Sequence, residues 1–477
     1  MGQKGWQPLS PLMTLFGYPK VRTITKINPE PVSFGSSILG GIVKLSIALL
    51  FLVTFNVGTL WAGSIQATTC HSSDVQAAIN SASDGDTVHI PPGTCTWTTQ
   101  VIMESAKAIT VQGAGIGMTT IVDNVPKGTG LYTSTLWDIT TALGKTFRLT
   151  GMTMRGLATP DTYNKGTVMF QGTSQAVRVD HIKFSRPSSS AIRFYGHIYG
   201  VVDHCDFDLS NQQQGIVIWH DLWNGYSHGD GSFSDSLYLG TNKAIYIEDN
   251  TFLGTGIAGT GTSDAEAGGR YVFRYNTVTN QNSANHGTET SGRTRSVRSY
   301  EIYHNTYNNN TSTELFTAIY LRGGTGVVFN NSTKGYTNAV RAANYRSERA
   351  YSPWGQCNGR SSYDGNSLAN GYPCLDQVGR GTTAVMFVGD PPRPTAWPQQ
   401  LLDPLYIWGN SFIPPLQSIY ATEVDSQDPD WIARGRDFIV GSPRPGYAPY
   451  VYPHPLVSGS TTTNNAPPAP PTNLRIN

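Results

Sequence analysis

The chain has 477 residues, with 33 Lys and Arg residues against 32 Asp and Glu residues, so its formal net charge is only +1. This balance leaves no basic surplus that would attract nucleic acid, which we exclude as a general partner. The 51 Gly, 24 Tyr and 17 Phe residues make the chain rich in residues that form turns and strands.

Residues 1–67 are predicted to be an N-terminal extension followed by a targeting segment. Lys44 precedes the apolar run 45–61, and small residues follow at 62–64. A basic residue, an apolar stretch and a small-residue cleavage site are typical of a secretory signal peptide. We favour a cleaved signal. The alternative is an uncleaved signal anchor, because the apolar stretch counted from Ile38 is long enough to span a bilayer, and only this segment is expected to touch a membrane.

A short amphipathic helix is predicted over residues 74–80, with Ala77, Ala78 and Ile79 on its apolar side. The segment 85–94, Gly-Asp-Thr-Val-His-Ile-Pro-Pro-Gly-Thr, follows it as a short strand that runs into a turn. Further alternating strands are predicted at 109–113, 147–154, 177–184 and 201–207.

Acidic residues mark the ends of the later strands at a regular step. Asp180 and Asp203 are 23 residues apart, and Asp249 follows Asp203 by 46 residues, which fits two more steps of 23. An enlarged turn at 219–236 is predicted between them. This step belongs to stacked supersecondary units, whose coils cannot bury their apolar faces singly.

The repeat is clearest where an alternating strand runs into Asn and a small hydroxyl residue. The repeated asparagines are Asn250, Asn276, Asn305 and Asn330, with steps of 26, 29 and 25 residues. Because Asn tolerates left-handed backbone geometry, we expect it at the sharp turn after each strand. Stacked coils then place Asn over Asn about 4.8 Å apart, so that their amides form a hydrogen-bonded ladder.

These units predict a solenoid from about Ser72 to about Phe412, within a β-helix domain at 70–452 that carries inserted loops. The chain resembles the pectate-lyase-like right-handed parallel β-helix superfamily, or pectin lyase fold, in the 74–80 and 85–94 segments and in the repeats. The resemblance covers roughly 70% of the chain. It implies an all-β, right-handed parallel β-helix solenoid with a short N-terminal capping helix that plugs the open end.

The cysteines support export. Cys70 and Cys95 bracket the cap helix and first strand, and Cys357 and Cys374 bracket a loop rich in Gly, Ser and Asn. Two local disulfides are therefore predicted, each contributing about 3 kcal/mol in the chain-entropy model. Cys205 is expected to be a buried small hydrophobe. Disulfides imply an oxidising compartment, so the protein is expected to be secreted or at the cell surface, anchored if the leader is retained.

Solenoids of this superfamily usually carry their sites where long turns overhang a parallel sheet, and the densest charged cluster lies at 285–295. A lyase acting by β-elimination needs a cation to neutralise the uronate carboxylate and a base to remove the C5 proton. His286, Arg293 and Arg322 are the candidate catalytic residues, and Glu289 and Arg295 are candidate substrate-binding residues. The competing interpretation is that these charges are solvated surface or stacked ion pairs.

Two other groups are candidates for ligand binding. Asp264 and Glu266, expected one coil away from His286, are candidate ligands for a Ca²⁺ ion. A second substrate-binding group contains residues suited to stacking on sugar rings and bonding their hydroxyls; its members are Trp219, His220, Trp223 and Tyr226. The alternative is that Trp219 and Trp223 only pin the enlarged turn.

The known mechanisms of the superfamily do not transfer residue by residue. Residues 201–205, Val-Val-Asp-His-Cys, match the pectate lyase motif V-W-I-D-H-C only in part, and the partner motif R-x-P-x-x-R has no counterpart. The paired Asp-Asp and N-T-D signatures of polygalacturonase-type hydrolases are also missing. We therefore expect Asp203 and His204 to be structural.

Residues 453–477 are predicted to be a linker or tail rich in Pro, Thr and Ser. The leading hypothesis is an exported carbohydrate-active β-helix protein, a polysaccharide lyase acting on an acidic, uronate-containing glycan. A non-catalytic surface protein that binds carbohydrate or mediates adhesion is the alternative, and a glycoside hydrolase is third. Convergence of a base, a cation and an acid at one point favours catalysis, whereas a row of aromatic side chains favours binding.

Overall fold

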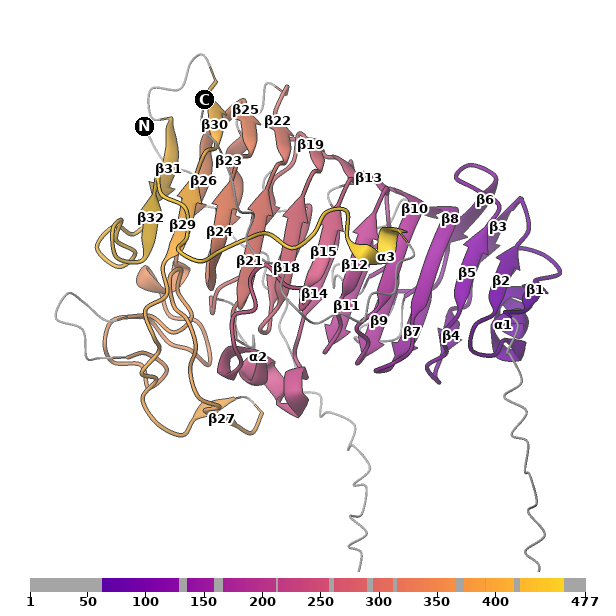
Figure 1. Cartoon of the computed structure of the whole chain (residues 1–477), viewed down its shortest axis with the longest axis horizontal. Coiled ribbons are helices and arrows are strands. Elements are labelled where there is room, and N and C mark those ends of the chain that lie inside the picture. Colours follow the sequence, from indigo (N-terminus) through magenta and orange to yellow (C-terminus); the bar gives the residue numbers. More distant parts are fainter. Residues whose placement is uncertain are drawn as a thin grey trace, which may run out of the picture. The chain divides into compact units, whose positions relative to one another are not determined.

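Short parallel strands pair coil upon coil along most of the length of the described chain (Figure 1). This computed structural model describes residues 62–127, 135–157, 166–211, 213–256, 261–289, 295–311, 315–365, 373–390, 392–415 and 421–458. The predicted leader up to residue 61 lies outside them. Among the described helices, none combines the length and the apolar character needed to cross a bilayer.

The largest sheet has 20 strands, and the pairings given for them are parallel. They are β1 (Ser64–Gln66), β2 (Thr87–Ile90), β3 (Gly93–Trp97), β5 (Thr110–Gly113), β6 (Thr119–Asp123), β8 (Phe147–Gly156), β10 (Val177–Ser185), β12 (Gly200–Asp203), β13 (Asp206–Asp208), β15 (Ile245–Glu248), β16 (Thr251–Leu253), β18 (Arg270–Arg274), β19 (Thr277–Thr279), β21 (Ser299–Tyr303), β22 (Thr306–Asn308), β24 (Thr325–Phe329), β25 (Ser332–Lys334), β29 (Leu405–Trp408), β30 (Ser411–Ile413) and β32 (Phe438–Val440).

Two further parallel sheets form the other strand-bearing face of the coils. One contains β4 (Val101–Met103), β7 (Trp137–Thr141), β9 (Val168–Gly172), β11 (Ile192–Gly196), β14 (Ile216–Trp219) and β17 (Ser263–Glu266). The next contains β20 (Ser283–Ala284), β23 (Leu315–Leu321), β26 (Tyr336–Ala342) and β31 (Thr422–Ser426). The parallel β-helix predicted from the repeats is confirmed, and its strands run from Ser64 to Val440, beyond both predicted ends.

Short helices and one antiparallel pair of strands lie between or after the strands of the coils along the chain. The helices are α1 (Ser72–Ser81), α2 (Asp230–Ser234) and α3 (Pro455–Ser458), with 3₁₀ turns at Trp223–Gly225, Ser227–Gly229 and Tyr345–Ser347. The antiparallel strands are β27 (Phe387–Val388) and β28 (Arg393–Pro394). Two of the 3₁₀ turns and α2 fill the enlarged turn predicted at 219–236.

The core runs along the inside of the coils, where equivalent apolar side chains stack from one coil to the next. Phe184, Phe207 and Phe252 form one such column, with neighbouring ring centroids 5.0 and 4.5 Å apart. The predicted inward residues Ile245 and Ile247 are also buried. Strand alternation sends the intervening side chains outward, so the pattern of the sequence decides which residues can reach a ligand.

The capping helix is confirmed, but its buried side differs from the prediction. Val75, Ala78 and Ile79 face the core, whereas Ala77 is exposed. The reason is helical spacing, because residues 75, 78 and 79 share one face and residue 77 points away from it. Trp97 is fully buried and its Nε1 donates to the Cys70 carbonyl at 2.8 Å.

An asparagine ladder connects the coils as predicted, with one residue corrected. The side-chain oxygen of each ladder residue after the first accepts bonds from the backbone N–H and the side-chain Nδ2 of the residue before it in the ladder, at 2.9 to 3.1 Å. The members are Asn250, Asn276, Asn305, Asn331 and Asn410. Asn331, not Asn330, therefore belongs to the ladder.

The left-handed backbone at this corner belongs to the residue before each ladder position. Asp249, Tyr275, His304 and Asn330 have φ values of 57°, 56°, 56° and 53°. The predicted left-handed geometry is therefore wrong for Asn250, Asn276 and Asn305, and it is confirmed for Asn330, which is not a ladder residue. The two steps of 23 residues predicted between Asp203 and Asp249 are also wrong, because β12 pairs directly with β15 and Asp203 lies opposite Glu248, a single coil of 45 residues.

Both predicted disulfides are present. Cys70 pairs with Cys95 and Cys357 with Cys374, with Cα atoms 5.7 and 5.5 Å apart. Cys205 is buried and unpaired, as expected, and burial raises the pKa of its thiol well above the usual value. The disulfides indicate folding in an oxidising compartment.

The C-terminal residues 444–458 cross the outer face of the largest sheet and end in α3 beside β12 (Figure 1). We call them the strap. Arg274 donates to the carbonyls of Tyr450 and Val451 at 2.8 and 2.9 Å, and Tyr452 stacks on Tyr275 with centroids 3.8 Å apart. The described part of the predicted tail, 453–458, is therefore packed on the solenoid.

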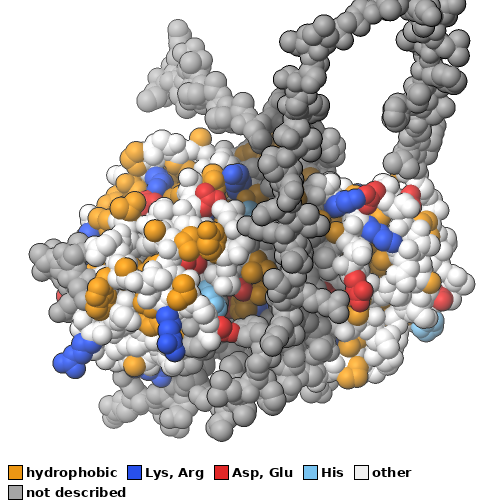
Figure 2. Space-filling view, turned by 90° about the horizontal axis from the view of Figure 1, so that it is seen from below, with side chains coloured by type: hydrophobic (Ala, Val, Ile, Leu, Met, Phe, Trp, Pro, Cys, Tyr) orange, Lys and Arg blue, Asp and Glu red, His pale blue; other side chains and the backbone are white. Residues whose placement is uncertain are grey.

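Figure 2 shows a face on which Lys and Arg side chains lie among Asp, Glu and hydrophobic side chains. In the part of that face that is not covered by grey atoms, charges of the two signs are interspersed, as the net charge of +1 would suggest.

Candidate functional site

A cluster of charged side chains lies outside β17, on the face opposite to the strap-bearing sheet. Asp264 and Glu266 alternate with the fully buried Ala265, so both point outward from the same strand. The Asp264 carboxylate is bonded on both oxygens: His286 Nδ1 lies 2.5 Å from Oδ1, and Gln214 Nε2 donates to Oδ2 at 2.6 Å. Three coils thus meet at this carboxylate.

His286 is fixed by its backbone as well as by Asp264. Its N–H donates to the Ala265 carbonyl at 3.0 Å, and its carbonyl accepts from the Val297 N–H at 3.0 Å. An ionised Asp264 favours the tautomer in which Nδ1 carries the proton, so Nε2 holds the lone pair of the ring. The geometry is that of a general base oriented by a carboxylate.

Arg322 follows β23 and approaches the same segment from the next coil. Its N–H donates to Asn285 Oδ1 and its Nε to the Asn285 carbonyl, both at 2.7 Å. The guanidinium forms an ion pair with Glu289 at 2.8 Å. Burial alone would lower the pKa of Arg322, but the Glu289 carboxylate outweighs it and raises that pKa, so Arg322 is a permanent cation.

Gly287 allows the close approach of these two coils. A Cβ atom at this position would lie 2.3 Å from the Arg322 carbonyl oxygen and 2.5 Å from Glu289 Oε2. Any other residue would push the His286 segment away from Arg322. The structure therefore brings together four predicted site residues, Asp264, His286, Glu289 and Arg322.

Two tyrosines beside Arg322 were not predicted. The guanidinium carbon lies 5.5 Å from the ring centroids of both Tyr320 and Tyr345, and the Tyr320 hydroxyl donates to that of Tyr345 at 2.7 Å. Tyr320 stands two residues before Arg322 on one outward strand face, a spacing that could have revealed it. Tyr345 follows β26, and no local pattern of the sequence places it here.

Two other arginines of the predicted site, Arg293 and Arg295, are not placed in this cluster by the structure. Arg293 lies outside the described residues. Arg295 was predicted to bind substrate, but it is fully buried, where its guanidinium bonds to Asp376 at 2.7 and 2.8 Å and to Asp230 at 2.6 Å. We correct that role, because a buried arginine held by two carboxylates joins the inserted loop to α2 and cannot reach a polysaccharide.

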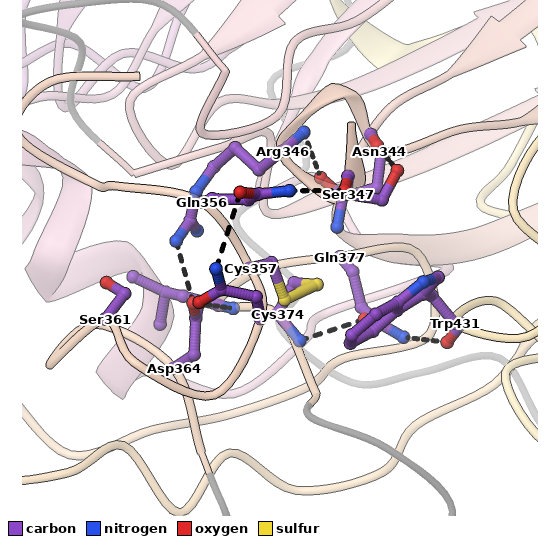
Figure 3. The surroundings of a disulfide bond; sticks show 12 residues. Asn344, Arg346, Ser347, Gln356, Cys357, Ser361, Asp364, Cys374, Gln377 and Trp431 are labelled. Atoms are coloured by element: carbon purple, nitrogen blue, oxygen red, sulfur yellow. Dashed lines mark hydrogen bonds and ion pairs between the residues drawn. A yellow bond between two sulfur atoms is a disulfide. The ribbon is translucent and has the colours of Figure 1, made fainter. Parts of the chain in front are cut away.

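The loop closed by Cys357 and Cys374 is bonded through Arg346 to the segment that carries Glu289, and Figure 3 shows the surroundings of its disulfide, with Arg346 and Asp364. The fully buried Arg346 bonds to Asp364 at 2.8 Å and to the Thr288 hydroxyl at 3.0 Å. Thr288 in turn donates to the Leu375 carbonyl at 3.3 Å. Because Thr288 precedes Glu289, this network holds the segment that carries the partner of Arg322.

The predicted aromatic group divides into buried and accessible members. Trp223 is fully buried, donates from Nε1 to Asp235 at 3.0 Å and lies under the Arg270 guanidinium, 4.4 Å from its carbon. His220 is also fully buried, and burial lowers the pKa of its ring well below the usual value. The prediction that Trp223 and His220 bind substrate was therefore wrong, because neither side chain is accessible. Trp223 instead holds the enlarged turn in place, as the alternative interpretation had it.

Trp219 and Tyr226 remain accessible. Tyr226 is 48% exposed, and Trp219 is half-buried with the Arg193 guanidinium carbon 3.8 Å from its ring centroid. Strand register places Tyr195 beside Trp219 and Trp219 beside Glu266 on successive coils. Tyr195, which was not predicted, thus extends a row of outward side chains that leads to the charged cluster.

The carboxylate oxygens of Asp264 and Glu266 are of the ligand type that Ca²⁺ prefers, but two residues supply only a few of the ligands that it needs. Among the residues that the structure describes, no group of three or more His, Cys, Asp or Glu side chains is arranged to hold a metal ion. A Ca²⁺ ion takes six to eight oxygen ligands, so water and substrate would have to supply most of them.

No protein-family model and no curated protein sequence matches the chain. Among solved structures, the alginate lyase from Paenibacillus sp. str. FPU-7 is 14% identical, covers 80% of this chain and 99% of its own, and has a TM-score of 0.38. A PL6 family polysaccharide lyase from Pseudopedobacter saltans is 15% identical over 80% of this chain and 91% of its own, with a TM-score of 0.36.

PfbA, a surface adhesin of Streptococcus pneumoniae, is 14% identical over 60% of this chain and 89% of its own, with a TM-score of 0.33. Sequence identities and TM-scores this low carry no argument about activity or substrate.

Proposed function

We propose that the protein is an exported carbohydrate-active enzyme, a polysaccharide lyase that cleaves a uronate-containing glycan by β-elimination at the cluster of Asp264, His286 and Arg322. One observation carries this proposal: Asp264 orients His286, and the Arg322 guanidinium from the next coil bonds to the carbonyl of Asn285, the residue directly before His286. A protein that only displays a binding surface has no need of an oriented base.

The chemistry follows from the roles of these groups. Arg322 neutralises the carboxylate at C5 of the uronate, which makes the C5 proton more acidic and stabilises the negative charge that develops when it leaves. His286 Nε2 removes that proton, while Asp264 stabilises the imidazolium that forms. The electron pair forms the C4–C5 double bond, the C4–O bond breaks, and the leaving oxygen takes a proton from water.

The outward row of Tyr195 and Trp219 supports a polysaccharide as the substrate. Their ring centroids lie 6.2 Å apart, and both side chains are half-buried, so each offers part of a ring to a sugar. The same row supports the second candidate, a non-catalytic carbohydrate-binding or adhesion protein. A Ca²⁺ requirement through Asp264 and Glu266 is proposed as an addition, and no step above depends on it.

The test is to incubate the purified chain with a panel of uronate polysaccharides, with and without calcium, and to follow the ultraviolet absorbance of the unsaturated product. His286→Ala should lower the rate at least about 100-fold, as expected for the loss of a general base. His304→Ala is the control, because His304 is exposed on the opposite sheet.

Absence of product with every polymer would contradict the lyase and favour the binding protein. Retained binding of a uronate polymer in affinity electrophoresis, lost in Trp219→Ala, would then establish that second function. A rate that is equal in the wild type and in His286→Ala would show that the cluster is not the active site.

A further inference from the structure

His181 and His204 occupy equivalent corners of two adjacent coils, on the face opposite to the proposed active site. Each follows an aspartate, and the two aspartates, Asp180 and Asp203, lie directly opposite one another in the pairing of β10 with β12. The histidines have φ values of 51° and 52°, in the left-handed region. This geometry turns both side chains out of the sheet, where they are 56% and 48% exposed.

A buried carboxylate holds each imidazole by its inner nitrogen. His181 Nδ1 lies 2.7 Å from Asp180 Oδ2, and His204 Nδ1 lies 2.9 Å from Asp203 Oδ2. Both aspartates are fully buried. Among the described residues, neither Nε2 atom has a hydrogen-bond partner.

Arginines also bond to both carboxylates. Arg148 bonds to Asp180 through two nitrogens at 2.7 Å, and Arg178 bonds to Asp203 at 2.8 and 2.9 Å. The Nδ1 N–H of each imidazole donates to the carboxylate beside it, so the lone pair of each ring is on the outer nitrogen, Nε2.

The two rings are stacked, with centroids 5.3 Å apart and planes only 3° from parallel. The aspartates alone would be satisfied by their arginines, so the ion-pair ladder does not explain why two exposed imidazoles stand in register. A neutral imidazole whose inner N–H is held by a carboxylate is the arrangement that proteins use to prepare a histidine as a metal ligand.

We propose that His181 and His204 bind one divalent transition-metal ion, of the Ni²⁺, Cu²⁺ or Zn²⁺ type, between their Nε2 atoms, with water completing the coordination. Imidazole nitrogens suit these ions, whereas Ca²⁺ and Mg²⁺ prefer oxygen ligands. A shared ion needs each Nε2 about 2 Å away. The rings must therefore tilt toward each other at their outer edges, which their exposure permits.

The next position in the same column explains why only two protein ligands are proposed. Asp249 follows His204 at the same corner one coil further on, and its carboxylate accepts from the Tyr452 hydroxyl at 2.7 Å. Coils are spaced by about 4.8 Å along the stack, so His181 and Asp249 are about two spacings apart. Three ligands in a straight column cannot converge on one ion.

The experiment is isothermal titration calorimetry of the untagged full chain with nickel chloride, and separately with calcium chloride. We expect one Ni²⁺ site in the wild type, and a loss of affinity of at least about tenfold in both His181→Ala and His204→Ala, comparable to the loss of a strong second-shell partner or more. Calcium should give no heat that depends on these residues.

His304→Ala is the matched control, since His304 stands in the same left-handed column and is exposed but stacks on Tyr275 instead of a histidine. Thermal unfolding of each variant shows whether it is folded. The proposal is overturned if the wild type binds no Ni²⁺, if the double variant His181→Ala/His204→Ala binds as tightly as the wild type, or if His304→Ala weakens binding equally.

Discussion

The Tyr447 hydroxyl donates to Oε2 of Glu301 at 2.5 Å, joining the strap to the outer face of β21 across 146 positions of the chain. The backbone N–H of Gly240 donates to the other carboxyl oxygen at 2.8 Å. Glu301 is buried beneath the strap, and burial raises the pKa of its carboxyl from 4.5 to about 7. The strap is thus held at one point by a carboxyl group that changes charge near neutral pH.

Stability should therefore fall as the pH rises through this range. In the unfolded chain Glu301 loses its proton near pH 4.5, whereas in the folded chain it keeps the proton until about pH 7. The folded state binds more protons between these values, so its free energy of unfolding declines from pH 4.5 to about 7 and levels off above. The full difference corresponds to about 3 kcal/mol.

Urea unfolding at pH values between 5 and 8 measures this decline in the free energy of unfolding. In Glu301→Gln the decline should be smaller by about 3 kcal/mol, because the variant lacks the titrating carboxyl group. The groups that face Glu301 are Tyr447 from the strap, Tyr246 and Tyr303 from the sheet, and Arg274. None of them is expected to titrate between pH 5 and 8. An unchanged pH profile in Glu301→Gln would contradict the assignment.

A second prediction separates the two adjacent asparagines at the end of β24. Asn331 donates to Ile302 and Asn410 and accepts from Asn305, all within the buried ladder. Asn331→Ala removes these bonds and leaves buried partners unsatisfied, so it should lower the free energy of unfolding by at least about 2 kcal/mol.

Asn330→Gly is the matched control one residue away. Asn330 has a φ of 53° and is exposed, so glycine relieves backbone strain there and the free energy of unfolding should change by less than about 1 kcal/mol. Denaturant unfolding of both variants measures the difference. If Asn330→Gly were the more damaging of the two, the ladder would be wrongly assigned.

This pair of asparagines also shows how far the sequence can predict the fold. Strand alternation and the repeat are local patterns, so the parallel coils, the cap helix and the ladder could be predicted from them. The choice between Asn330 and Asn331 could not, because both adjoin the same strand and only the spacing to the next coil decides which amide points along the stack. The strap contacts, such as Tyr447 with Glu301, leave no periodic signal at all.

A third prediction concerns the buried ion pair that joins Arg346 to Asp364 of the disulfide-closed loop. Both side chains are fully buried. Asp364→Asn leaves the Arg346 charge without its partner and should lower the free energy of unfolding by about 3 to 5 kcal/mol. Because Arg346 also holds Thr288, the segment of Glu289 should lose order, which hydrogen exchange of residues 285–289 would detect.

Asp425→Asn is the control for this effect. Asp425 pairs with Arg341 at 3.3 Å on neighbouring strands, with 30% and 18% of their side chains exposed. Loss of such a partly exposed pair should cost no more than about 1 kcal/mol. Equal losses in the two variants would show that the inserted loop does not depend on the buried ion pair.

The candidate site was only partly predictable for the same physical reasons as the fold. The coil period placed Asp264, His286 and Arg322 in neighbouring turns; in the structure Asp264 bonds to His286, and Arg322 bonds to Asn285, the residue before His286. Burial could not be predicted for Trp223 and Arg295, because the inserted loop and the enlarged turn that cover them have no repeat. Residue type alone cannot distinguish an arginine that faces a ligand from one that joins two loops.

The last prediction tests calcium. If Asp264 and Glu266 share a Ca²⁺ ion with the carboxylate of the substrate, chelation should lower the lyase rate and added calcium should restore it. Glu266→Gln should remove this response, because it takes away a negative charge while Asp264 remains bonded to His286 and Gln214. The control is Asp425→Asn, which removes a partly exposed acidic side chain on β31. Its rate should respond to calcium like that of the wild type. A chelator that leaves the wild-type rate unchanged would remove calcium from the mechanism, and the His286 and Arg322 roles would stand without it, since neither depends on a metal ion.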